Sequence, residues 1–253
     1  LLLASCGGGS VGYEGEGMAL LGFRVLTYDL YGRGLSARPE GKQNPLFFRQ
    51  QLAELLADQD IEDDVILMGY SMGGAIAADY AVTYPENIQR IIMLAPAGLG
   101  QRMPEFTRLM VKIPFIGDGL IYAFGGLMYG RSTRAMNAAK AAAPGLKPWP
   151  MQERKSRGFM AAVLSSYRHT LSQDQTEIHR ILAVQDIPVL AIWGDEDETI
   201  PLSAMGKLAE MHRTARQEVI KGAGHSLIYT HPRPIITAIQ EFLRNVAEAA
   251  HQK

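Results

Sequence analysis

Short apolar runs alternate with helix-forming segments at both ends of the chain. The apolar runs, which have the length of buried strands, lie at residues 1–5, 23–28, 65–68, 91–94, 188–193 and 217–220. The helix-forming segments lie at 13–21, 45–59, 203–212 and 234–249, with one more from Ser71 to near Pro85. Strands that alternate with helices predict a mostly parallel sheet with helices on both faces, and therefore an α/β fold.

This alternation breaks after Pro96 and resumes at residue 188. The intervening segment is predicted to be helical but irregular, because its methionines and aromatic residues are interrupted by Gly and Pro. We interpret residues 98–185 as a helical cap inserted into one α/β core made of residues 1–97 and 186–253, because long insertions commonly carry function. A larger core with extra helices is the alternative. The large apolar residues of this segment are Met103, Phe106, Met110, Phe115, Ile116, Tyr122, Phe124, Met128, Tyr129, Met136 and Trp149.

Composition and charge narrow the class of protein. The chain has 253 residues, of which 47% are hydrophobic and 20% are charged. This length and composition are typical of a globular protein with one large core. The net charge of -1 and the lack of a basic stripe argue against a nucleic-acid partner. The chain has no run of 18 apolar residues that would predict a transmembrane helix, and its single cysteine excludes an internal disulfide. We therefore expect a cytoplasmic protein.

The first residues allow a second interpretation of location. Leu3-Ala4-Ser5-Cys6 resembles the bacterial lipobox, in which Cys6 would be lipidated. The apolar segment before Cys6 is too short for a signal peptide, and no basic region precedes it. The alternative is a buried strand that enters a glycine loop, in a chain that lacks its earlier residues.

The candidate chemistry begins with Gly69-Tyr70-Ser71-Met72-Gly73, which lies between an apolar strand and a run of small helix formers. This order of strand, turn and helix predicts a nucleophile elbow that exposes the Ser71 hydroxyl at the edge of the sheet. The first peptide N–H groups of the helix would then stabilise negative charge at the same place. Residues 8–12 also match the pattern around Ser10, but a flexible glycine loop explains that match.

A serine nucleophile needs a base and a carboxylate that orients the base. The strand at 188–193 leads into Gly194-Asp195-Glu196-Asp197, and the next strand leads into Gly222-Ala223-Gly224-His225. His225 is the only histidine in a strand-end loop that follows the acidic loop. For the others, surface or packing roles are favoured; they are His169, His179, His212, His231 and His251.

Together these motifs resemble the α/β-hydrolase superfamily over nearly the whole chain. The resemblance also covers residues 28–36, Tyr-Asp-Leu-Tyr-Gly-Arg-Gly-Leu-Ser. It implies that the acid is Asp197, the fourth position of G-x-x-D, with Asp195 as the alternative. The segment Ile113-Pro114-Phe115-Ile116-Gly117-Asp118 loosely resembles the caps of monoacylglycerol-lipase-like members.

Two departures from the family pattern concern the N-terminal region. Members usually begin with antiparallel strands, for which no residues remain before the strand at 1–5. The loop after that strand usually begins His-Gly and supplies a backbone oxyanion donor, whereas here the sequence is Ser5-Cys6-Gly7. The resemblance implies Met72 N–H as one oxyanion donor and Cys6 or Gly7 N–H as the other.

The expected function is that of a serine hydrolase, a lipase-like esterase acting on carboxylic esters of apolar acyl or aryl groups through Ser71, His225 and Asp197. The expected partner is a small-molecule ester, with transient contact of the cap with a membrane surface. No nucleotide-binding loop or metal-ligand spacing is present, so no cofactor or metal is expected. The alternatives are a carbon–carbon bond hydrolase of ring-cleavage products and a non-catalytic binding protein. The sequence leaves the oligomeric state open.

Overall fold

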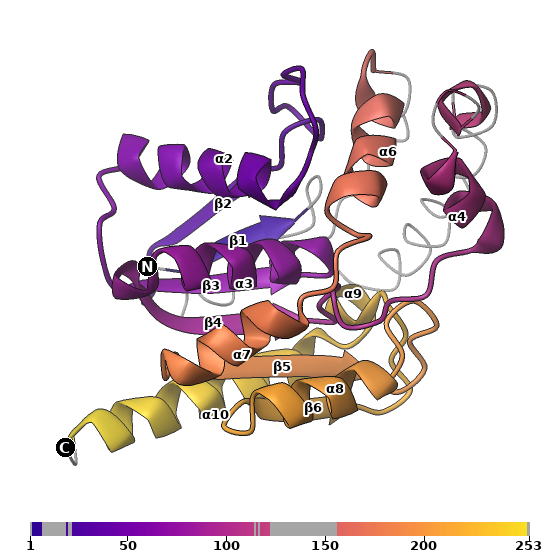
Figure 1. Cartoon of the computed structure of the whole chain (residues 1–253). Coiled ribbons are helices and arrows are strands. Elements are labelled where there is room, and N and C mark those ends of the chain that lie inside the picture. Colours follow the sequence, from indigo (N-terminus) through magenta and orange to yellow (C-terminus); the bar gives the residue numbers. More distant parts are fainter. Residues whose placement is uncertain are drawn as a thin grey trace.

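A six-stranded, wholly parallel sheet forms the centre of the protein (Figure 1). The computed structural model describes residues 2–6, 19, 22–113, 115, 117–121 and 156–251. The spatial order of the strands is β2-β1-β3-β4-β5-β6, so the chain crosses over between β2 and β3. The strands are β1 (Leu2–Cys6), β2 (Val25–Asp29), β3 (Val65–Tyr70), β4 (Ile88–Leu94), β5 (Val189–Gly194) and β6 (Arg216–Ile220).

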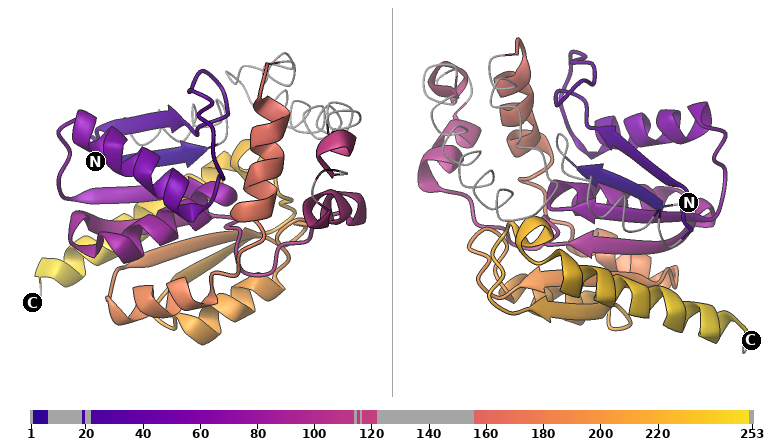
Figure 2. Two further views of the ribbon diagram at one scale, coloured as in Figure 1. Left: turned by 45° about the horizontal axis from the view of Figure 1, so that its top comes forward. Right: turned by 180° about the vertical axis from the view of Figure 1, so that it is seen from behind.

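Helices cover both faces of the sheet. On one face lie α2 (Pro45–Asp58), α3 (Met72–Thr83), α7 (Thr176–Val184) and α8 (Ser203–Met211), each beside the next (Figure 1). Behind the sheet lie α9 (Leu227–Thr230) and α10 (Pro232–His251) (Figure 2). A short 3-10 helix, η1 (Pro85–Asn87), joins α3 to β4. The predicted parallel sheet with flanking helices is confirmed.

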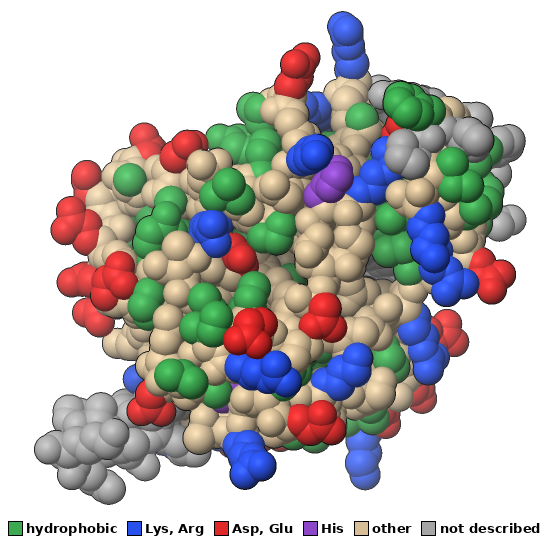
Figure 3. Space-filling model, in the orientation of Figure 1, with side chains coloured by type: hydrophobic (Ala, Val, Ile, Leu, Met, Phe, Trp, Pro, Cys, Tyr) green, Lys and Arg blue, Asp and Glu red, His purple; other side chains and the backbone are tan. Residues whose placement is uncertain are grey.

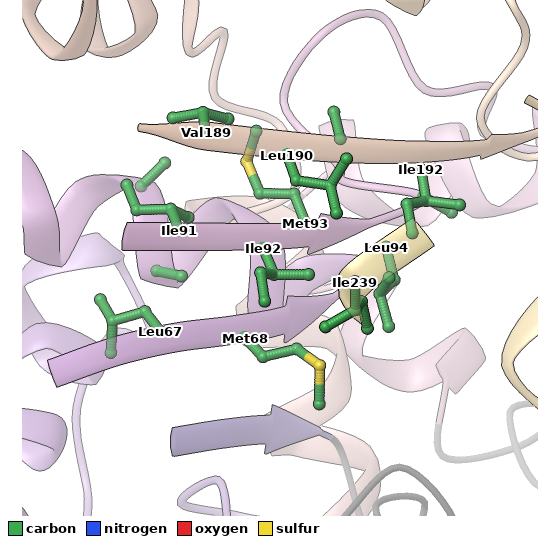
Figure 4. Packing of buried hydrophobic residues seen from close by; sticks show 14 of the residues in the cluster. Leu67, Met68, Ile91, Ile92, Met93, Leu94, Val189, Leu190, Ile192 and Ile239 are labelled. Atoms are coloured by element: carbon green, nitrogen blue, oxygen red, sulfur yellow. The ribbon is translucent and has the colours of Figure 1, made fainter. Parts of the chain in front are cut away.

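The central strands are buried because both of their faces are covered. Every residue from Val65 to Gly69 is buried, as is the whole of β5. Such strands have continuous apolar sequences rather than alternating ones. Figure 4 shows side chains of β3, β4 and β5 in contact across the sheet, with Ile239 of α10 beside Leu94. This core fixes the strand ends from which the candidate site is built.

Local sequence signals set the ends of several helices. Pro45 occupies the first position of α2, and the Asn44 side chain accepts a hydrogen bond from Phe47 N–H. Of the leucines expected to face inward on α2, Leu52 and Leu56 are buried, and Leu55 is half-buried. The expected helix at 13–21 falls almost entirely outside the described residues.

Two described helices of the segment 98–185 lie beyond the carboxyl ends of the strands. These are α4 (Glu105–Lys112) and α6 (Phe159–His169), which contact one another (Figure 1). The third helix, α7, instead packs against α3 and α8 in the layer that covers the sheet. The division into a core and a cap stays a prediction, and within it α7 has the contacts of a core helix.

Charged side chains of both signs are spread over the face seen in Figure 3. Acidic side chains gather at the edge where the strands begin, in the loop after α2, which carries Asp60, Glu62, Asp63 and Asp64. Within the described residues, no helix is both long and apolar enough to span a membrane.

Histidines are buried between the helices that cover the sheet. His179 in α7 has no exposed surface, and neither of its ring nitrogens has a hydrogen-bond partner within the described residues. Burial and, to a smaller extent, the nearby His212, itself buried, lower the pKa of His179 to about 4. His179 is therefore neutral in the folded protein at neutral pH.

Acid should weaken the fold through His179. An unfolded histidine binds a proton below about pH 6.5, whereas folded His179 does so only near pH 4. The unfolded state therefore binds more protons in this window, and the free energy of unfolding falls by up to about 3 kcal/mol as pH drops through it. Denaturant titrations at pH 7 and pH 4.5 should show a smaller loss for His179→Leu than for the parent protein. An equal loss in both proteins would contradict this prediction.

Candidate active site

The candidate nucleophile lies at a strained turn between β3 and α3. Ser71 has a φ of 53° and a ψ of -116°, a conformation that non-glycine residues adopt rarely and at a cost of about 1–3 kcal/mol. Its N–H donates to the Leu94 carbonyl at the end of β4, at 2.8 Å. Its carbonyl accepts from Gly74 N–H and Ala97 N–H, each at 3.0 Å. Hydrogen bonds to the neighbouring strand thus fix the turn.

Close packing, and not a positive φ, explains the glycine before the serine. A Cβ atom added to Gly69 would lie 2.2 Å from the Gly73 carbonyl oxygen and 2.5 Å from the Gly74 nitrogen. A Cβ atom at Gly74 would lie 2.9 Å from the Cβ of Pro96. The strand and the first turn of α3 therefore approach each other more closely than any side chain would allow.

The loop after β5 buries one carboxylate and exposes its neighbours. The Asp197 side chain has no exposed surface, and its Oδ1 accepts hydrogen bonds from Thr199 N–H and Ile200 N–H, both at 2.8 Å. Its other oxygen, Oδ2, faces His225. Asp195 is exposed and accepts from Gly222 N–H at 2.7 Å, so it braces the loop that leads to His225.

The structure brings Ser71, Asp197 and His225 together at the carboxyl edge of the sheet. His225 Nδ1 lies 2.8 Å from Asp197 Oδ2, and His225 Nε2 lies 3.1 Å from Ser71 Oγ. The His225 side chain is 27% exposed, whereas the carboxylate below it is sealed from solvent. A hydroxyl, an imidazole and a carboxylate in this order can pass a proton from the serine to the ring.

Tyr70, which precedes the serine, contacts the histidine loop. Its hydroxyl donates to the His225 carbonyl oxygen at 2.7 Å, across 155 positions of sequence. Its ring packs against the imidazole, with ring centroids 5.2 Å apart and an interplanar angle of 34°. This role could not be predicted from the sequence, because the middle positions of G-x-S-x-G accept many residue types.

The expected oxyanion donors lie in two places. Met72 is the first residue of α3, where a backbone N–H has no acceptor within the helix. Cys6 ends β1, one position after Ser5, which pairs with Gly69 of β3. Its backbone therefore reaches the sheet edge next to the elbow. Gly7, the other expected donor, lies outside the described residues.

A cavity of about 450 Å³ opens onto Ser71 and His225. Its described walls come from the loop after β4, from α4 and α6, and from the loop after Asp197. Met103 and Met110, two of the apolar residues noted in the sequence, line it. Phe115 is 89% exposed, and Phe106 and Leu109 on the outer face of α4 are also exposed. The other large apolar residues of the segment, from Ile116 to Trp149, lie outside the described residues.

A buried polar network attaches α6 to the loop after β2. The Arg33 guanidinium donates to the Ser166 hydroxyl at 2.8 Å and to the Gln43 side-chain oxygen. Gln43 also accepts from the Thr170 hydroxyl through its backbone carbonyl, at 2.7 Å. The sequence placed Arg33 in a family motif without predicting this contact, because the partners lie 133 positions apart.

Comparison with known protein families identifies the family to which this chain belongs. Residues 1–232 match the family model described as alpha/beta hydrolase fold, so the protein belongs to the α/β-hydrolase family. Among curated relatives, the 2-hydroxy-6-oxo-6-(2'-aminophenyl)hexa-2,4-dienoic acid hydrolase of Metapseudomonas resinovorans is 21% identical over 95% of this chain and 83% of that protein.

Two further proteins, from other organisms, are similar to this chain. The human monoacylglycerol lipase ABHD6 is 26% identical over 74% of this chain and 57% of its own length. The structure of a thermophilic esterase from Thermogutta terrifontis superimposes with a TM-score of 0.70 at 23% identity, covering 97% of this chain and 89% of that one. These similarities establish the fold and the hydrolase family.

The close approach at Gly69 gives a direct test of the elbow. Gly69→Ala should lower the free energy of unfolding by at least about 1–3 kcal/mol, because the new Cβ would overlap backbone atoms that have no room to move. Gly206→Ala is the matched control, since Gly206 is exposed within α8 and nothing lies near its added Cβ. That substitution should stabilise the protein by about 0.5–1 kcal/mol. Urea unfolding curves measure both changes, and equal effects at the two positions would contradict the packing argument.

Proposed function

We propose that the protein is a serine hydrolase that cleaves carboxylic esters of apolar acyl or aryl groups. The observation that carries this proposal is the continuous contact from Asp197 through His225 to Ser71 at the mouth of the cavity. Membership of the α/β-hydrolase family and the apolar cavity walls support it.

In the proposed first step, His225 Nε2 takes the Ser71 proton while Oγ bonds to the ester carbonyl carbon. The buried Asp197 carboxylate accepts a hydrogen bond from Nδ1–H, which keeps the neutral ring in the tautomer that leaves Nε2 open. The carbonyl oxygen gains negative charge, which Met72 N–H at the start of α3 would stabilise. Cys6 or Gly7 N–H is proposed as the second donor.

In the second step, the protonated His225 gives its proton to the leaving alcohol as the carbon–oxygen bond breaks. The acyl group is then attached to Ser71. A water molecule that loses its proton to His225 attacks the acyl carbon, and the acid departs as Ser71 recovers its proton. Every proton passes through one imidazole, so the orientation of that ring governs the rate.

Tyr70 is proposed as a positioning residue for that ring. Its hydroxyl holds the His225 carbonyl and its ring lies against the imidazole, so it restrains the base from two sides. In this mechanism Tyr70 acts through the ring of His225 and not on the reacting atoms.

A carbon–carbon bond hydrolase is the second candidate, favoured by the similarity to the dienoic acid hydrolase of Metapseudomonas resinovorans. The same serine and histidine would act on a ketone carbonyl, and a carbon group would leave in place of an alcohol. Comparing ring-cleavage products with simple esters as substrates distinguishes the two activities.

The partner is proposed to be a small ester, with the cap in transient contact with a membrane surface. The exposed Phe106 and Leu109 support this contact, because they belong to α4, whose Thr107 and Met110 line the cavity. Phe115, which follows α4 in the chain, is exposed as well.

A fluorophosphonate probe should label Ser71 in the native protein. Ser71→Ala removes the reacting oxygen and should abolish labelling, and His225→Ala should slow it strongly because no base remains. Hydrolysis of p-nitrophenyl esters should fall at least about 10⁴-fold in both variants. The control is Ser36→Ala, which changes a serine remote from the cavity lining. A folded protein with neither labelling nor hydrolysis would favour the non-catalytic binding protein and overturn the proposal.

Removing the Tyr70 hydroxyl should affect turnover more than binding. Tyr70→Phe keeps the ring contact but loses the hydrogen bond to the His225 carbonyl, so kcat should fall about 3–10-fold while KM changes little. The rate of fluorophosphonate labelling should fall by the same factor. Tyr84→Phe, a tyrosine remote from the cavity, controls for loss of a hydroxyl. Equal rates in Tyr70→Phe and the parent protein would show that the hydrogen bond does not position the base.

A further inference from the structure

The wall of the cavity formed by α4 and α6 is apolar with two exceptions. Its apolar side chains include Met110, Met160, Val163 and Leu164, which suit a hydrocarbon or aryl group. Thr107 of α4 and Tyr167 of α6, which carry hydroxyl groups, line the same cavity. The two helices contact each other, so these hydroxyls belong to one continuous surface.

Neither hydroxyl has a hydrogen-bond partner among the residues that the structure describes. Thr107 is only 7% exposed, and Tyr167 is half-buried. Neither hydroxyl oxygen is among the buried, unpaired side-chain atoms of the described residues, so both can be reached from the cavity. A hydroxyl at the wall of a mostly apolar cavity finds its hydrogen-bond partner in a molecule that occupies the cavity. Their partner is therefore expected within the cavity.

The surroundings of Tyr167 favour an acceptor as this partner. Burial raises the pKa of the Tyr167 phenol, so it remains a proton donor at neutral pH, while the nearby positive charge of Arg33 partly opposes the rise. That guanidinium is fixed through Ser166, the residue before Tyr167 in α6. The positive charge near the Tyr167 hydroxyl favours binding of an electron-rich oxygen atom there over binding of a second hydrogen-bond donor.

We propose that Thr107 and Tyr167 bind an oxygen atom of the substrate, beyond those of the scissile ester, so that the natural substrate is an oxygenated ester and not a plain hydrocarbon one. The oxygen would be a carbonyl or ether oxygen held in a mostly apolar cavity. A few well-placed polar groups within an apolar pocket are the usual source of specificity for small ligands. This inference rests on the proposed ester hydrolysis and adds the substrate class.

The test compares esters that differ only in that oxygen. On the acyl side, p-nitrophenyl hexanoate is compared with its 4-oxo and 5-oxo derivatives, each corrected for spontaneous hydrolysis. On the alcohol side, butyl hexanoate is compared with 2-methoxyethyl hexanoate, in which an ether oxygen replaces one CH2 group. At least one oxygenated ester should have a kcat/KM about tenfold above its plain counterpart, because each pair differs by one hydrogen bond.

Tyr167→Phe should remove this preference, so that the ratio of kcat/KM for the oxygenated ester to kcat/KM for the plain ester falls to about one. Thr107→Val, which has nearly the same shape, should reduce the preference independently, so the test survives a folding defect in either variant. Tyr80→Phe is the matched control: burial also raises the pKa of Tyr80, to about 12, but Tyr80 lies in α3 and does not line the cavity.

Each outcome bears on a different claim. Hydrolysis of the plain esters with no preference for oxygen, or a preference that survives in both Tyr167→Phe and Thr107→Val, overturns the inference and leaves the proposed hydrolase intact. Hydrolysis of none of the esters, combined with no fluorophosphonate labelling, overturns the proposed function and the inference with it.

Discussion

The sharp turn at Ser71 is the constraint on which the rest of the site depends. A serine with a φ of 53° persists only because the surrounding backbone over-determines it. The peptide groups of Ser71 are bound on one side to Leu94 and on the other to Ala97, while Gly69 lets the strand press against the first turn of α3. The hydroxyl is thereby presented at the sheet edge, and the start of the helix points toward the same place.

The other two members of the site come from strands on the same edge. Asp197 follows β5 and His225 follows β6, while β4 separates both from the serine. Their two loops are joined directly, since Glu196 N–H donates to the Ala223 carbonyl and Asp195 accepts from Gly222 N–H. Because a parallel sheet places all of its carboxyl ends on one side, residues 154 positions apart meet without any long-range adjustment of the chain.

The cavity has a different physical origin from the triad. Ser71 and His225 line it from the loops at the sheet edge, and much of its wall belongs to α4 and α6. Side-chain hydrogen bonds attach α6 to the core. Arg33 and Gln43, in the loop after β2, bind Ser166 and Thr170 of α6 and its C-terminal end in a buried polar network. Such a network fixes one arrangement of the helix, because every alternative leaves buried polar groups unpaired. The proposed catalytic residues thus come from the core, and the proposed selectivity comes from helices attached to it.

The sequence by itself determined the parallel α/β architecture, because the alternation of buried strands and helices leaves few other ways to cover a sheet on both faces. It also indicated Ser71 and His225, since each follows a strand end within a glycine-containing motif, whereas the choice of Asp197 within its acidic loop came from the resemblance to the family pattern G-x-x-D. Only the tertiary structure shows that Asp197 is deeply buried while Asp195 is exposed and braces the loop, because both carboxylates lie in one acidic loop of the sequence. Tyr70, Thr107 and Tyr167 carry no local signal, and only tertiary packing placed their hydroxyls against the His225 carbonyl and the cavity. Strand and turn patterns are encoded by neighbours in sequence, whereas the contacts of a single hydroxyl depend on segments a hundred residues away.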